Sequence, residues 1–153
     1  MKLDVTVKLR MLENRSDSVA MDAIGVAAIT IIREETQKKH IDQNGRRFKK
    51  YSKDYAEFRK KKGRGTAVDL NFTGDMLKYL MVKESDAVSV VIGFLDATPA
   101  SGGLKPSQKM RHTNDVRPWF GFGRAGSKRR INVQRVGREI FLRALTGRGG
   151  GSN

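Results

Sequence analysis

The range Gly45–Leu77 constrains the fold and the partners of this chain more than any other part of the sequence. Between Arg46 and Gly65 it carries ten lysine and arginine residues against two acids, Asp54 and Glu57. Four aromatic residues are interleaved with these cations: Phe48, Tyr51, Tyr55 and Phe58. Because aromatic residues at these spacings can reach a hydrophobic core, the pattern indicates an ordered basic lobe rather than a solvated charge run. Such a lobe predicts an acidic binding partner.

Local signals divide this range into an arm and two short helices. Gly45–Tyr51 is expected to be an extended arm that follows a turn. Ser52 is placed to cap a short helix over Lys53–Lys62. Thr73 is placed to cap a second helix, which we expect from Gly74 to about Leu80.

Composition limits the class of protein. The chain has 153 residues, a formal net charge of +15 and no cysteine. The charge favours contact with nucleic acid or with acidic protein surfaces. The absence of cysteine excludes disulfides, thiolate metal sites and cysteine nucleophiles. The longest apolar run, Ile24–Ile32, is far shorter than the roughly 20 residues of a membrane-spanning helix, so we expect no membrane association.

Hydrophobic periodicity predicts an α+β fold. Alternation in Lys2–Leu9 predicts a strand, and Leu80–Lys83 with Ala87–Phe94 predict a hairpin. Helical spacing predicts one long helix from Ser18 to about Lys39 and another over about Arg130–Leu145. We therefore expect an antiparallel sheet packed against two long helices, with an extended arm and a long loop.

The chain is expected to form a single domain over residues 1–146, because no repeat or second core is apparent. Within it, residues 43–66 form the basic arm and loop. Residues 96–115 are rich in Pro, Gly, Ser and Thr, and they predict a mobile loop longer than a compact domain needs. Residues 147–153 predict a flexible glycine-rich tail.

No pattern in the sequence indicates a catalytic, cofactor or metal site. His40 falls at a helix end and His112 in a loop, and neither has a second His or Cys at ligand spacing. The acids are scattered, although two could meet in space, so a small metal-dependent nuclease is the enzyme alternative. Gly121–Gly126 fits G-x-G-x-x-G without a preceding βαβ unit, and we interpret it as a turn into the last helix. We expect no enzymatic activity and no cofactor.

The basic segment and the single tryptophan are the candidate contact residues. Trp119 is either a core anchor or an interface anchor, and both can hold in a ring. The basic residues can form a solvated face, a nucleic-acid surface or an interface with acidic proteins. The last is favoured, since the aromatic residues have spacings that suit packing. The candidate contacts are Arg46, Arg47, Lys49, Lys50, Arg59, Lys60, Lys61, Lys62, Arg64 and Trp119.

Three stretches between Ser18 and Leu145 share the pattern of one family. The first is Gly45-x-x-Phe48-x-x-Tyr51-Ser52-x-x-Tyr55, which follows an alanine-rich helix and precedes a basic run. The second is Val68–Leu77, with a Thr-Gly-Asp step into a helix, and the third is Arg117–Gly121 before the last helix. Together they resemble the small neck and tail-completion proteins of tailed bacteriophages, of the virion-morphogenesis type seen in Mu-like phages.

The resemblance implies a virion structural protein without catalysis. It implies a homo-oligomer, a hexameric ring, that caps the tail tube as a completion or terminator protein or joins tail to head around the DNA channel. Its expected partners are the adjoining neck and tail-tube proteins, with non-specific contact to DNA in the channel. Its expected location is the neck or tail of the virion, after assembly in the host cytoplasm. The alternative is a stand-alone basic nucleic-acid-binding protein.

Overall fold

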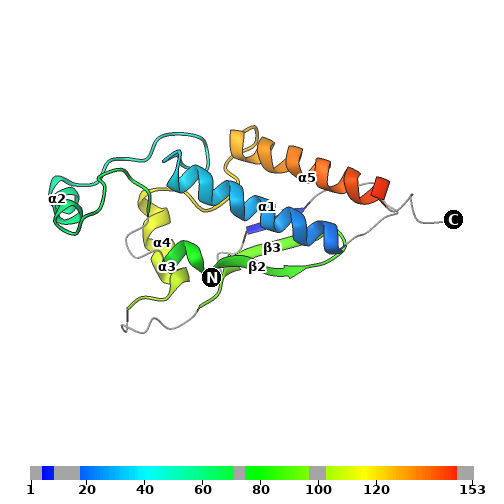
Figure 1. Cartoon of the computed structure of the whole chain (residues 1–153), viewed down its shortest axis with the longest axis horizontal. Coiled ribbons are helices and arrows are strands. Elements are labelled where there is room, and N and C mark those ends of the chain that lie inside the picture. Colours follow the sequence, from blue (N-terminus) through cyan, green and yellow to red (C-terminus); the bar gives the residue numbers. More distant parts are fainter. Residues whose placement is uncertain (1–4, 9–17, 71–74, 97–102, 148–153) are drawn as a thin grey trace.

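The computed structural model describes residues 5–8, 18–70, 75–96 and 103–147 (Figure 1). Within these ranges the chain forms, in order, β1 (Val5–Lys8), α1 (Ser18–Gln37), α2 (Lys53–Lys61), α3 (Asp75–Lys78), β2 (Leu80–Ser85), β3 (Ser89–Phe94), α4 (Pro106–Val116) and α5 (Lys128–Gly147).

The three strands form one antiparallel sheet in the order β1-β3-β2. In the register, Val90 lies opposite Val7 and Ile92 lies opposite Val82. The β2–β3 ladder shifts register between Val82 and Glu84. Because β3 is central and faces α1, its Val90 and Ile92 side chains are fully buried.

Helix α1 lies along β2 and β3, and α5 runs along the other side of α1 (Figure 1). This double contact explains why the middle of α1 is apolar around most of its circumference. Gly25 allows α1 to approach the sheet closely, because a Cβ atom there would lie 2.6 Å from Val82 Cγ2 and 2.7 Å from Val90 Cγ2. The predicted α+β class, with an antiparallel sheet and two long helices, is confirmed, and α5 reaches this layer mainly through its packing on α1.

The basic segment leaves the body of the molecule and carries α2 at its far end (Figure 1). Its first part is anchored, since Ile41 and Arg47 form an antiparallel bridge and Phe48 is buried. The hydroxyl of Ser52 accepts a hydrogen bond from the Tyr55 amide, which confirms the predicted cap of α2. Thr73, expected to cap the next helix, lies outside the described residues.

The expectation of a mobile loop over residues 96–115 is wrong for its second half, which is the helix α4. Pro106 stands in the first turn, where its fixed φ angle and missing amide hydrogen suit a helix start. The Asp96 carboxylate accepts hydrogen bonds from the Ser107 amide, at 3.1 Å, and from the Ser107 hydroxyl, at 2.8 Å. The buried side chain of Met110 fixes the helix to the core. His112 therefore lies in a helix and not in a loop, while residues 97–102 lie outside the described residues.

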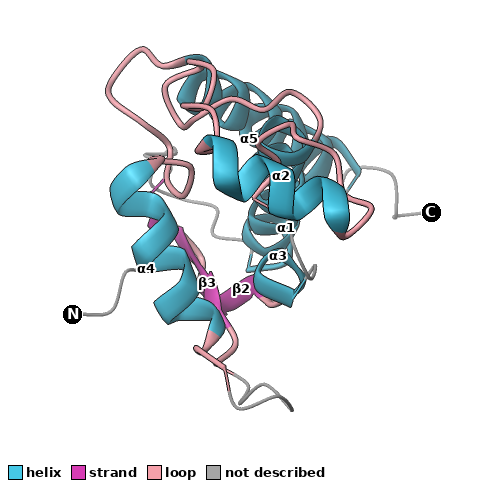
Figure 2. Cartoon of the chain, turned by 90° about the vertical axis from the view of Figure 1, so that its left-hand side faces the viewer, coloured by secondary structure: helices cyan, strands magenta, loops and turns pink. Residues whose placement is uncertain are grey.

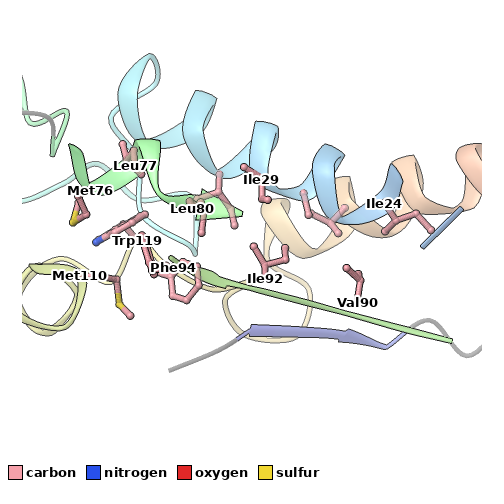
Figure 3. Close-up of a cluster of buried hydrophobic side chains, with 14 of the residues drawn as sticks. Ile24, Ile29, Met76, Leu77, Leu80, Val90, Ile92, Phe94, Met110 and Trp119 are labelled. Carbon is pink, nitrogen blue, oxygen red and sulfur yellow. The ribbon is translucent and has the colours of Figure 1, made fainter. Parts of the chain in front are cut away.

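The buried core joins α1, the sheet, α3 and α4 (Figure 3). Trp119 belongs to this core and is fully buried within one subunit. Its indole Nε1 donates to Thr113 Oγ1 at 3.0 Å, and its ring lies against Phe94 and Phe120. The expectation that Trp119 contacts a partner is therefore wrong, because its side chain has no exposed surface. A Trp-Phe pair in sequence serves a core and an interface equally well, so only burial distinguishes them.

The glycine-rich stretch after Trp119 is a turn that leads into α5, as predicted. Gly121, Gly123 and Gly126 all have positive φ angles. Gly123 has a second constraint, since a Cβ atom there would lie 2.3 Å from the Gln43 carbonyl oxygen.

Candidate functional site: a basic cleft beside helix α2

Eight of the nine predicted basic contact residues are exposed, on α2 and on the segments that flank it. Figure 2 shows the molecule from this end, with α2 and α4 both toward the viewer. The eight are Arg46, Arg47, Lys49, Lys50, Lys60, Lys61, Lys62 and Arg64.

Arg59 is the exception, and its expected role as a partner contact is wrong. Its side chain is 1% exposed, and its Nε donates to the Gly65 carbonyl oxygen at 2.8 Å. Its Nη2 donates to Asp69 Oδ1 at 3.0 Å and to Asp69 Oδ2 at 3.2 Å. Arg59 therefore holds the loop after α2 against α2 itself. The sequence shows a run of four cations from Arg59 to Lys62, and helix geometry turns only the first one inward.

Tyr51 is fixed by two arginines from different parts of the chain. The guanidinium carbons of Arg59 and Arg117 each lie 5.0 Å from the centre of the Tyr51 ring, a distance typical of cation–π contacts. Arg117 also donates to the carbonyl oxygens of Lys49, at 3.0 Å, and Lys50, at 3.2 Å. Burial raises the pKa of the Tyr51 hydroxyl above its ordinary value, although the positive charge of Arg59 opposes this shift. The hydroxyl is therefore neutral at physiological pH.

A cleft of about 850 Å³ opens between this segment and α4. Apolar side chains from three parts of the chain line it: Leu70, Met76, Leu104 and Val116. Basic side chains also line it: Lys49, Lys50, Arg59, Lys109 and Arg117. The remaining lining residues are Tyr51, Ser52, Tyr55, His112 and Thr113, so no acid is found among the described residues that line the cleft. Cations over an apolar floor suit an anionic group that is linked to an apolar one.

The wall of the cleft that α4 forms was not predicted from the sequence, because residues 96–115 were expected to be a loop. Lys109 and His112 reach the cleft only because α4 is a helix. The sequence does hold a signal for this helix: Pro106 is followed by eleven residues without glycine or proline. The cleft itself depends on contacts between distant segments, and no local pattern predicts it.

The described parts of the chain contain no group of three or more His, Cys, Asp or Glu side chains that could hold a metal ion. Among the same residues, no helix is both long enough and apolar enough to cross a membrane. Comparisons with protein-family models, with curated proteins and with solved structures found no match to this chain.

Proposed function

We propose that the chain is a structural subunit of a tailed-bacteriophage virion, of the tail-completion or terminator type. It forms a ring, hexameric by the family resemblance, that caps the tail tube or joins tail to head around the DNA channel. The motifs of that resemblance support this proposal: Gly45–Tyr55, Val68–Leu77 and Arg117–Gly121.

The observation that carries the proposal is the exposure of apolar side chains at both ends of a small, strongly charged subunit. At the end formed by the start of α1 and the β2–β3 turn, Val19 is 74% exposed and Val88 is 59% exposed. At the end formed by α2 and α4, Leu104 is 48% exposed and Val116 is 58% exposed. Apolar groups that gather beside charged rims are typical of interaction sites, and a subunit with neighbours on two sides buries them.

The exposed cations suit an acidic partner outside the ring. In a ring of such subunits the positive charges add, and their repulsion grows unless acidic groups meet them. The adjoining neck and tail-tube proteins, or DNA that passes through the ring, provide such groups. Lys60, Lys61 and Lys62 project from α2 and are the foremost candidates for this contact.

A second candidate function is stand-alone binding of nucleic acid. The eight exposed cations favour it, as do Tyr55 and Phe58, which are 37% and 43% exposed beside them. A protein of this kind binds DNA strongly as a monomer, with an affinity that falls steeply as salt rises.

Assembly state tests the proposal. We expect the purified full-length chain to form rings of defined mass, by light scattering and by negative-stain electron microscopy. We expect no cleavage of plasmid DNA in the presence of magnesium or manganese. A chain that stays monomeric at every concentration but binds DNA would support the second candidate, and DNA cleavage that survives stringent purification would contradict both.

A further inference from the structure

The β2–β3 hairpin closes in a turn that its own side chains hold in place. The Asp86 amide donates to the Ser89 carbonyl oxygen at 2.9 Å, which leaves Ala87 and Val88 at the tip. The Asp86 carboxylate accepts hydrogen bonds from the amides of Val88, at 2.8 Å, and Ser89, at 2.7 Å, and from the Ser89 hydroxyl at 2.7 Å. The turn therefore presents the exposed Val88 side chain in a fixed position. A group that is already ordered loses less entropy when it binds.

Acids lie beside this tip. Asp22 and Glu84 are both exposed, and with Val26 they border a shallow hollow between α1 and β2. Lys83 is the only cation among the described residues that line this hollow. Figure 1 shows that the start of α1 and the hairpin turn lie at one end of the molecule, whereas α2 lies at the other.

The basic cleft at the other end has the opposite charge and the same apolar character. Lys49, Lys50 and Lys109 line it together with the exposed side chains of Leu104 and Val116. A chain with a net charge of +15 repels its own copies unless their contact brings opposite charges together. The acidic, valine-bearing end and the basic, apolar cleft meet this condition.

We propose that each subunit of the ring inserts the tip of its β2–β3 hairpin into the basic cleft of the next subunit. This inference rests on the proposed ring and names the contact that builds it. In this contact Val88 packs on Leu104 and Val116, while Glu84 faces Lys50 and Lys109. Two different surfaces at opposite ends of a subunit make a head-to-tail contact, and repetition of such a contact closes a ring when the rotation allows it.

The shape and chemistry of the cleft favour the hairpin tip over a nucleic-acid strand. Its volume lies in the range that encloses a drug-sized molecule, so it admits a few side chains rather than a whole helix. The aliphatic walls suit a valine side chain, whereas bases stack on aromatic faces. The ring of Tyr51, the most enclosed aromatic side chain of the cleft, is already in contact with the guanidinium groups of Arg59 and Arg117, so it is less available to stack on a base.

Charge reversal tests the contact on the full-length chain. The cleft variant carries Lys50→Glu and Lys109→Glu, and the tip variant carries Asp22→Lys and Glu84→Lys. A control variant, Lys60→Glu with Lys61→Glu, makes the same change in charge as the cleft variant on residues outside the cleft. Light scattering at matched protein concentration and low salt measures the mass of each species, and circular dichroism checks that each variant is folded.

We expect the wild type and the control to assemble, and each of the other variants to need at least a tenfold higher concentration for half-assembly. An equimolar mixture of the cleft and tip variants should assemble again. In the mixture the acidic tip of the cleft variant meets the basic cleft of the tip variant, and the basic tip of the tip variant meets the acidic cleft of the cleft variant. If either variant assembles alone like the wild type, the cleft–tip contact is excluded while the ring stands. A wild type that remains monomeric at every concentration overturns both the ring and this contact. Loss of binding to a single-stranded DNA oligonucleotide, with assembly unchanged in the cleft variant, assigns the cleft to nucleic acid instead.

Discussion

Arg129 on α5 and Glu35 on α1 form a buried ion pair, in which Arg129 Nε lies 2.7 Å from Glu35 Oε2. Arg129 also donates to the carbonyl oxygens of Trp119 and Gly121. Burial lowers the pKa of Arg129, and the Glu35 carboxylate opposes this shift. One side chain thus ties the two long helices and the tryptophan segment together.

Removing one partner of this pair should destabilise the protein strongly. We expect Glu35→Ala to lower the free energy of unfolding by about 3–5 kcal/mol, because it leaves the Arg129 charge buried without compensation. The matched control is Glu139→Ala, which removes an exposed i,i+4 pair with Arg135 and should cost about 0.3–0.5 kcal/mol. Urea denaturation measures both changes in the free energy of unfolding. Equal changes would show that the buried pair stabilises the protein no more than the exposed pair does.

The fluorescence of Trp119 should report unfolding but not dissociation. Its side chain is fully buried within one subunit, so we expect the same emission maximum before and after dilution separates the subunits. Urea should shift the maximum to longer wavelength as the core opens. A shift that follows dilution, with the secondary structure intact, would place Trp119 at a subunit contact.

Gly25→Ala should destabilise the protein, although alanine is normally the better helix former by up to about 1 kcal/mol. The added methyl group would overlap Val82 and Val90, and overpacking of this kind costs about 1–3 kcal/mol. Gly65→Ala is the control, because no atom lies within 4 Å of a Cβ atom there. Thermal unfolding should show a lower Tm for the first variant alone. A higher Tm for Gly25→Ala would mean that α1 is free to move off the sheet.

The start of α4 should be sensitive to acid. Partial burial raises the pKa of Asp96, but the hydrogen bonds from Ser107 outweigh this and hold the pKa below its ordinary value. A carboxyl group whose pKa is lowered by folding stabilises the protein above its unfolded pKa and loses this contribution as the pH falls through its folded pKa.

The variant Asp96→Asn isolates this effect. Its free energy of unfolding should be lower than that of the wild type near pH 7. The difference should shrink as the pH falls below the ordinary pKa of aspartate, roughly 3.9, and vanish once the pH is below the lowered pKa of folded Asp96. Ser107→Ala removes the hydroxyl donor and should reduce the same pH-dependent difference. A difference between wild type and Asp96→Asn that is constant over this range would show that the charge of Asp96 does not hold α4.

The cations at the end of α2 should control contact with an acidic partner. We expect replacement of Lys60, Lys61 and Lys62 by glutamate to block the joining of heads to tails in vitro, without effect on the fold, since all three side chains are exposed. If DNA is the partner, the same variant should weaken non-specific binding, and the log–log salt slope should become shallower by about 0.9 for every phosphate that the variant no longer neutralises. Normal joining of heads to tails by this variant would show that the end of α2 lies outside the interface.

Local sequence signals were enough to predict most of the secondary structure. Alternation predicted the hairpin, helical spacing predicted α1 and α5, and Ser52 marked the start of α2. The turn at Gly121–Gly126 was also predictable, because glycine is the residue that tolerates positive φ angles. These features depend on neighbours in sequence, so the sequence contains the whole signal.

Tertiary structure alone decided which charged and aromatic residues remain available to a partner. Arg59 and Lys60 are adjacent cations in the sequence, yet Arg59 is buried on Asp69 and Lys60 faces solvent. Trp119 is buried in the core, and Arg129 pairs with Glu35, which lies 94 positions away in the sequence. Such pairings depend on how distant segments pack, and burial in a low-dielectric interior then selects the side chains that have a partner there. By itself the sequence determined the elements, their order and the excess of positive charge, whereas packing determined where that charge can act.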